Sequence, residues 1–133
     1  MSIIEKIYIV ADVMAKKKTR IVICDRSQLA TNIYEMILKP HGVTLFTFSS
    51  LSEFRKAWDS AIRVDALVVN ENALDKKGKD LNWLEEEPKL KKVRRYFLCS
   101  EKDSKLKSVF RGNKQNRTID LPFYPEVFGK AIL

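Results

Sequence analysis

The sequence is poor in the residues that most often build covalent cross-links and metal sites. Its 133 residues include two cysteines, Cys24 and Cys99, and one histidine, His41. Each cysteine lies at the end of an apolar run, which is the usual setting of a reduced, buried thiol in a cytosolic protein. We therefore expect no disulfide framework, no zinc site and no cofactor.

Long apolar runs are also missing. No run approaches the roughly 20 residues that a helix needs to cross a membrane. The first fourteen residues hold several isoleucines, but Glu5, Lys6 and Asp12 interrupt them and no small-residue cleavage site follows. We expect neither a membrane segment nor a signal peptide, and we predict a cytoplasmic location.

Glycine and proline are scarce, with four of each, while 45% of the residues are hydrophobic. This composition is typical of one ordinary globular domain, and the length allows a single well-buried core. The formal net charge is +8. A solvated basic surface explains that charge most simply, although it also suits nucleic-acid or acidic-protein partners.

Short apolar runs alternate with amphipathic stretches along the chain. Five runs have the pattern of strands: residues 20–25, 43–48, 64–69, 96–99 and 117–121. Helices are predicted after Ser27, after one of Ser49, Ser50 and Ser52, from Leu81, after Asp103 or Ser104, and from Pro125. Alternation of this kind predicts an α/β fold with a five-stranded parallel sheet in the order 2-1-3-4-5, the flavodoxin-like arrangement with helices on both faces.

The predicted domain occupies residues 16–133, and residues 1–15 form an N-terminal extension. Apolar side chains of the extension fall on one helical face, although residues 6–10 also suit a strand. A packing helix, a partner-binding arm and a dimer contact are all open for it. Ligands of open parallel sheets bind at the carboxyl ends of the strands, which directs attention to Asn70 after the third strand.

Several segments resemble response-regulator receiver domains, the CheY-like superfamily. The run Ile-Val-Ile-Cys-Asp ending at Asp25 resembles the family's first strand, and Asp65 precedes Asn70 by five residues as an aspartate precedes the family's phosphoacceptor. Residues 81–100 resemble its third helix and fourth strand. The run Asp120-Leu-Pro-Phe resembles its Thr-Lys-Pro-Phe turn, and Pro125 starts its last helix. The resemblance covers residues 19–133 and implies a CheY-like three-layer sandwich.

The positions that carry phosphoryl chemistry in the family do not match. The phosphoacceptor position is Asn70, and an amide cannot form an acyl phosphate as a carboxylate does. Asp25 keeps one acid of the pair that holds Mg²⁺, but Arg26 replaces the other and has the wrong charge. The hydroxyl position is Cys99, or Ser100 in the neighbouring register, and the lysine position is Leu121. The resemblance therefore implies a pseudo-receiver that is not an enzyme.

Alternative roles remain for these residues. Arg26 is expected to fill the former cation site by pairing with Asp25, Glu71 or Asp120. Asp25 or Glu71 could instead accept a phosphoryl group by a different geometry. Cys99, Trp58 and Trp83 are expected in the core, and Thr118 stands where the family often has a switch aromatic.

Receivers act by offering one face to another protein, commonly the fourth helix, fifth strand and fifth helix. Here that face is basic and holds Lys105, Lys107, Ser108, Arg111, Lys114, Arg117 and Thr118. A second basic cluster spans residues 89–95. We predict phosphorylation-independent binding of a protein partner in a two-component or phosphorelay pathway, with an acidic partner surface favouring association. Nucleic-acid binding by the basic surface is the alternative, and a homodimer is left open.

Overall fold

The computed structural model describes residues 2–3, 18–100 and 114–133. Its centre is one parallel sheet with the strand order β2-β1-β3-β4-β5. The strands are β1 (Arg20–Cys24), β2 (Thr44–Phe48), β3 (Ala66–Asn70), β4 (Arg94–Cys99) and β5 (Asn116–Asp120). This order and the covering helices confirm the predicted flavodoxin-like, CheY-like fold.

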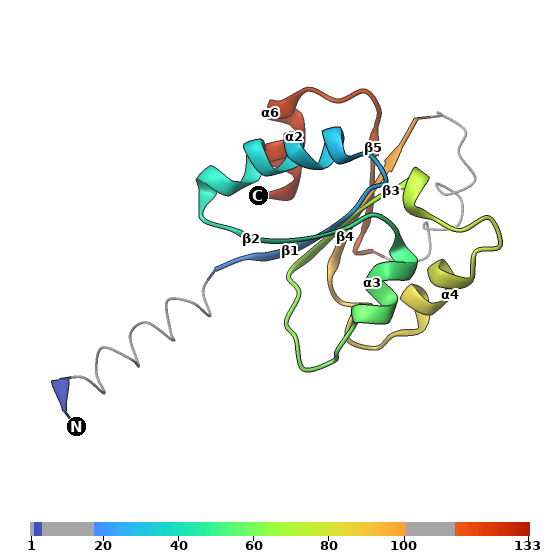
Figure 1. The fold of residues 1–133 in the computed structure, drawn as a ribbon, viewed down its shortest axis with the longest axis horizontal. Coiled ribbons are helices and arrows are strands. Elements are labelled where there is room, and N and C mark those ends of the chain that lie inside the picture. Colours follow the sequence, from blue (N-terminus) through green and yellow to red (C-terminus); the bar gives the residue numbers. More distant parts are fainter. Residues whose placement is uncertain (1, 4–17, 101–113) are drawn as a thin grey trace.

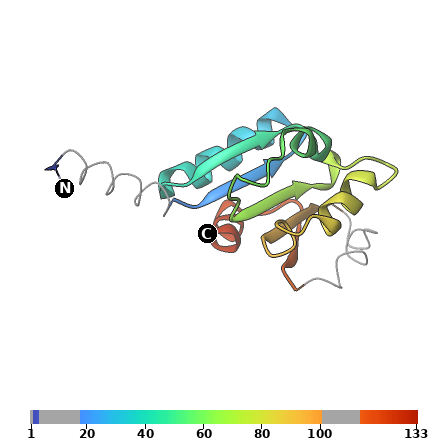
Figure 2. The same ribbon diagram turned by 90° about the horizontal axis from the view of Figure 1, so that it is seen from below.

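Helices cover both faces of the sheet, which gives three layers (Figure 1). The described helices are α2 (Gln28–Leu38), α3 (Leu51–Ala57), α4 (Lys79–Glu86) and α6 (Pro125–Ile132), with short 3₁₀ turns η1 (Lys39–His41) and η2 (Glu71–Ala73). Helices α2 and α6 lie on one face, and α3 and α4 lie on the other. Seen from below, β2 forms one edge of the sheet beside β1 (Figure 2). The predicted helix after Asp103 or Ser104 lies outside the described residues, as do residues 4–15 of the predicted extension.

The central strand β3 holds the two halves of the core together. Successive side chains of a strand point to opposite faces. Ala66 and Val68 therefore pack with α2 and α6, while Leu67 and Val69 pack with α3 and α4. All five residues of β3 are buried, as the short apolar run predicts for a strand covered on both sides.

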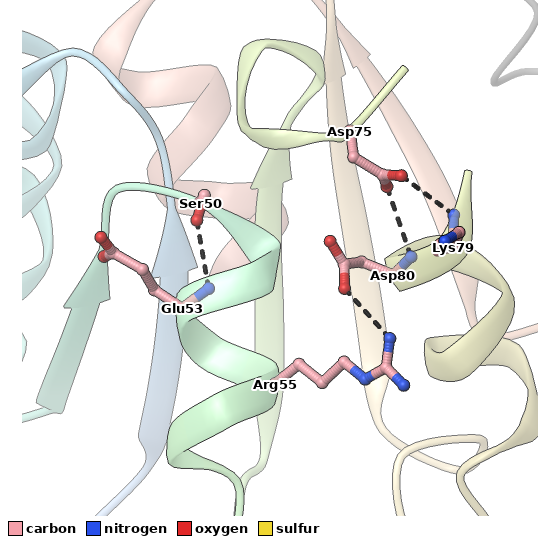
Figure 3. Close-up of polar contacts among 6 residues, drawn as sticks. All are labelled: Ser50, Glu53, Arg55, Asp75, Lys79 and Asp80. Atoms are coloured by element: carbon pink, nitrogen blue, oxygen red, sulfur yellow. Dashed lines mark hydrogen bonds and ion pairs between the residues drawn. The ribbon is translucent and has the colours of Figure 1, made fainter. Parts of the chain in front are cut away.

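Serine caps fix where two of the helices begin. Ser27 accepts a hydrogen bond from the Ala30 N–H and caps α2, as the sequence predicts. Ser50 is the residue among the three candidate serines that caps α3, through the Glu53 N–H (Figure 3). The Glu53 carboxylate in turn accepts from the Ser49 N–H at 3.2 Å. This reciprocal arrangement satisfies amide donors that a helix start would otherwise leave unpaired.

Several element boundaries differ from the prediction. The spacing of Phe54, Ala57, Trp58, Ala61 and Ile62 predicts one apolar helical face, but helix α3 ends at Ala57 and Ile62 is 42% exposed. The reason is local, because the Asp59 carboxylate accepts from the Ala61 N–H and stabilises a turn. Strand β4 begins at Arg94, two residues before the predicted start at Tyr96. The prediction misses Arg94 and Arg95 because charged side chains do not show the apolar pattern of a buried strand.

The core residues predicted from the sequence are mostly in place. Cys24 and Cys99 are buried and form no disulfide, and burial raises the pKa of the Cys24 thiol well above its ordinary value. Trp58 and Trp83 are partly buried and pack against the core beside α3 and α4. No helix in the described part of the chain has the length and apolar character needed to cross a bilayer.

Helix α4 takes its N-terminal cap from a residue that precedes it by four positions. Gly78 occupies the cap position with a φ of 73° and has no side chain to contribute. The Asp75 carboxylate instead accepts from the backbone N–H groups of Lys79 at 3.1 Å and Asp80 at 3.3 Å (Figure 3). Burial alone raises the pKa of Asp75, but these N–H groups outweigh it and leave the pKa below its ordinary value.

We expect Asp75→Ala to lower the free energy of unfolding by about 1 kcal/mol at pH 7, the usual cost of losing a helix cap. Because the pKa of Asp75 is lowered in the folded state, its charge stabilises the fold above pH ~4 and that contribution is lost as the pH falls further. Urea denaturation at several pH values measures this. Asp75→Asn keeps an acceptor without the charge, so its stability relative to wild type should improve at acidic pH. An unchanged difference between the wild type and Asp75→Asn below pH ~4 would contradict the role of the charge.

Candidate functional site

The carboxyl ends of β1 and β3 bring Asp25 and Asn70 together. The two strands are neighbours in the sheet, and Cys24 pairs with Val69 in register. The next residue of each strand therefore projects from the same edge, where the Asn70 Nδ2 lies 3.0 Å from Asp25 Oδ2. Asp25 is 3% exposed and Asn70 is 7% exposed. This is the edge at which open parallel sheets bind their ligands.

Four hydrogen bonds surround the Asp25 carboxylate. Oδ1 accepts from the Ser27 N–H at 2.8 Å and from Asn72 Nδ2 at 3.0 Å. Oδ2 accepts from the Tyr34 hydroxyl at 2.6 Å and from Asn70 Nδ2. An ionised carboxylate offers about four acceptor sites. All of them are thus occupied by donors that carry no charge.

Tyr34 is the donor that comes from a helix rather than from a strand end. It lies on the sheet-facing side of α2 and stacks on Phe128 of α6, with ring centroids 5.1 Å apart. Burial raises the pKa of Tyr34 far above its ordinary value, and its hydrogen bond to Asp25 raises it further. The phenol therefore keeps its proton and acts as a donor to Asp25 at neutral pH.

Asn70 uses both ends of its amide. Its nitrogen donates to Asp25, and its Oδ1 accepts from the Asn72 backbone N–H at 3.0 Å, which caps η2. An aspartate at this position could accept from Asn72 but could not donate to Asp25 unless it were protonated. The amide of Asn70 therefore fits this pocket better than a carboxylate would.

Arg26 does not pair with the acids predicted for it. None of the ion pairs formed by the described residues joins Arg26 to Asp25, Glu71 or Asp120, so that prediction is wrong. The Arg26 Nε donates instead to the Asn72 carbonyl oxygen at 2.5 Å. Glu71 is already engaged, because its Oε1 accepts from the Ser100 N–H at 2.9 Å and from the Ser100 hydroxyl.

The carboxyl ends of β4 and β5 hold Cys99, Ser100 and Leu121. Cys99 is fully buried in the core on the α3 and α4 side, as predicted for a small core residue. Ser100 is the exposed hydroxyl at this strand end, and Glu71 holds it. Leu121 packs against the core on the α2 and α6 side, and its N–H donates to the Cys99 carbonyl at 2.8 Å.

The residues present do not fit the Mg²⁺ ion that the family resemblance implies. Asp25 is the one carboxylate in its own hydrogen-bond cluster, and its acceptor sites are already filled. The nearby Asn72 carbonyl oxygen is taken by the Arg26 guanidinium. Within residues 18–100 and 114–133, no three His, Cys, Asp or Glu side chains converge on a metal position.

Two members of this pocket were missed by the sequence analysis, namely Tyr34 and Asn72. Tyr34 has a detectable signal, since it falls with Thr31 and Leu38 on one side of α2. A hydroxyl on that buried side needs a partner, and Asp25 lies nine residues earlier, just before the helix. Asn72 carries no comparable signal, because its role depends on a contact with a residue 47 positions away.

The predicted partner surface is only partly described. Lys105, Lys107, Ser108 and Arg111 lie outside the described residues. Lys114, Arg117 and Thr118 are exposed, the last two on the edge strand β5. The Arg117 Nη1 donates to the carbonyl oxygens of Lys114 and Asn116. These contacts place the guanidinium along the start of the strand.

No protein-family model matches the chain, and no curated protein does. Solved structures do match. The chemotaxis response regulator CheY4 of Vibrio cholerae is 17% identical, with a TM-score of 0.73, over 86% of this chain and 96% of that one. A response regulator receiver domain protein from Bacillus halodurans is 15% identical, with a TM-score of 0.72, over 86% and 94% of the two chains.

The signal receiver domain of an HD domain-containing protein from Pseudomonas fluorescens is likewise 15% identical, with a TM-score of 0.71, over 86% of this chain and 84% of that one. Likeness at such identities concerns the backbone fold, and the residues of the pocket are judged on their own geometry. By strand order, helix placement and this likeness, the chain has the CheY-like fold of response-regulator receiver domains.

Proposed function

We propose that the chain is a pseudo-receiver, which takes part in signal transduction by binding a protein partner and is not switched by phosphorylation. The observation that carries this proposal is the saturated Asp25 carboxylate beside the Asn70 amide. A nucleophile needs a free lone pair and a path to its target, and an amide is a poor nucleophile. The pocket provides neither an acceptor for a phosphoryl group nor an open cation site.

The alternative acceptor Glu71 is also unsuited. Its Oε1 is bound to the backbone and hydroxyl of Ser100, which holds the carboxylate against the end of β4. The Arg26 guanidinium is already engaged, because its Nε donates to the Asn72 carbonyl oxygen. What the fold retains is a rigid scaffold with a basic surface, and steering by opposite charge favours acidic protein partners.

We expect no phosphoryl transfer when the full chain is incubated with Mg²⁺ and acetyl phosphate. The intact mass, measured under conditions that preserve acyl phosphates, should stay unchanged. A receiver with a standard phosphoacceptor aspartate, treated in parallel, should gain one phosphoryl group and shows that the reagent is active. A phosphoryl group on Asp25 or Glu71 of this chain would overturn the proposal. Binding of the partner should be equal with and without the phosphodonor.

A further inference from the structure

The second basic cluster of the sequence lines a pocket at the end of the sheet opposite to Asp25. The turn between α4 and β4 and the loop between α3 and β3 lie together at the amino-terminal ends of the strands, at the bottom of Figure 1. They line an open pocket of about 470 Å³. That volume lies within the ~300–1,000 Å³ range of ligand pockets. None of its lining residues is acidic.

The floor of this pocket is apolar. Val64 and Val93, each 9% exposed, come from the segments that lead into β3 and β4. Trp58 is a further lining residue, and its ring packs edge-on against Phe54 with centroids 5.7 Å apart. Ile62 also lines the pocket and is 42% exposed. A partner side chain placed here would exchange water for these apolar surfaces.

The rim of the pocket is basic. Arg63 Nη2 donates to the Lys18 carbonyl at 2.6 Å and lies 3.5 Å from Asp65 Oδ2, so its charge is partly balanced. Lys89 Nζ donates to the Ser60 carbonyl at 2.5 Å, which holds the ammonium group over the loop. Lys92 is exposed beside them. Two lysines thus border an apolar floor without a neighbouring carboxylate in the lining.

We propose that this pocket binds an acidic peptide segment of a partner protein, with one bulky apolar side chain on the floor and carboxylates against Lys89 and Lys92. The inference rests on the proposed function, since it names where and how the partner is bound. A pocket with an apolar floor and a basic rim is complementary to an apolar side chain that is flanked by acidic residues. It matches a nucleic-acid backbone less well, because phosphates would leave the floor around Trp58 unused.

A defined peptide tests this on the full chain. The probe is a fluorescein-labelled five-residue peptide with a central phenylalanine and two acidic residues on each side, followed by fluorescence anisotropy. A second peptide replaces the phenylalanine by serine. We expect the phenylalanine peptide to bind at least about tenfold more tightly, because its apolar side chain is removed from water on the pocket floor. Equal affinity of the two peptides would overturn the proposal.

A matched pair of charge reversals locates the site. Lys92→Glu and Lys77→Glu each lower the formal net charge of +8 by two, and Lys77 lies in the loop before α4, outside the pocket lining. We expect Lys92→Glu to weaken the phenylalanine peptide about tenfold and Lys77→Glu to change it less than about twofold at physiological salt. Equal weakening by both variants would assign the binding to the net charge alone.

An oligothymidylate competitor separates the two classes of ligand. We expect it not to displace the phenylalanine peptide at physiological salt, and displacement that depends on Lys92 would overturn the proposal in favour of nucleic acid. The proposed function is tested separately, because the mass measurement with acetyl phosphate does not involve this pocket. If the cellular partner binds Lys92→Glu as tightly as the wild type, the pocket assignment fails and the pseudo-receiver function stands.

Discussion

Asn70→Asp is expected to destabilise the domain by about 3 kcal/mol at pH 7 and to create no phosphoryl acceptor. The substitution replaces the amide nitrogen 3.0 Å from Asp25 Oδ2 by an oxygen, so that a donor becomes a second acceptor. Both positions are almost completely buried. Two carboxylates at hydrogen-bond distance cannot both stay ionised at low cost, and the pKa of one of them rises.

The pH dependence of Asn70→Asp separates repulsion from simple loss of a contact. A carboxyl pKa raised in the folded state means that the folded protein binds more protons than the unfolded chain. The variant is therefore least impaired at acidic pH, and its deficit grows as the pH rises through the raised pKa. Asn70→Ala removes the same hydrogen bond without adding a charge, and we expect a loss of about 1–2 kcal/mol that depends little on pH near neutrality.

Urea denaturation of both variants between pH 5 and 8 measures these differences. The mass experiment with acetyl phosphate, repeated on Asn70→Asp, checks the second half of the expectation. Stability equal to that of the wild type at pH 7 would show that Asp25 does not depend on neutral donors. Efficient phosphorylation of the variant would show that the remaining pocket is still able to assemble a cation site.

The sequence identifies the fold well because the signals of a parallel sheet are local. Each strand is a short apolar run, and Ser27 and Ser50 each cap the helix that follows. The closeness of Asp25 and Asn70 also follows from topology, since both residues end neighbouring parallel strands. These inferences need only periodicity, capping and strand order. They do not need knowledge of side-chain conformations.

The chemistry of the pocket is less accessible from sequence. Opposite charge predicts a pair between Arg26 and an acid, but the guanidinium donates to the Asn72 carbonyl. The acids nearest to it already have partners: four uncharged donors hold Asp25, and Ser100 holds Glu71. Which donor reaches which acceptor depends on rotamers and on contacts between segments that are distant in the sequence, such as Arg26 and Asn72, which are 46 positions apart. The pattern of charges along the sequence contains no information on rotamers or on such long-range contacts.

The hydrogen bonds of Asp25 also explain how a carboxylate is kept at a buried strand end. A charge in the interior is costly unless it is compensated. Tyr34, Asn70 and Asn72 supply donors from three different elements, and the carboxylate thereby ties α2 to the ends of β1 and β3. In this pocket Asp25 therefore acts as a structural connector between these elements.

Arg95 is another buried charged residue, and its replacement by an apolar side chain of similar length is expected to stabilise the fold. The side chain is 0% exposed on β4, beneath α4. Its Nη1 donates to the Leu84 carbonyl at 3.2 Å and lies 3.2 Å from Glu85 Oε1, a contact that meets the distance of an ion pair but not the angle of a hydrogen bond. Among the described residues, Nε and Nη2 have no hydrogen-bond partner. Burial lowers the pKa of Arg95, and Glu85 opposes that shift only in part.

We expect Arg95→Met to raise the free energy of unfolding by about 1–2 kcal/mol, because an apolar chain of similar length fills the space without the cost of desolvating a charge. Arg95→Ala should lower it by about 2–3 kcal/mol, because a cavity remains between β4 and α4. Arg94→Met, on the exposed neighbour, is the matched control and should change stability by less than about 0.5 kcal/mol. If Arg95→Met were as destabilising as Arg95→Ala, the guanidinium would have to be held by more than Leu84 and Glu85. Urea denaturation of the three variants at pH 7 therefore decides whether this buried cation stabilises the fold or only occupies volume in it.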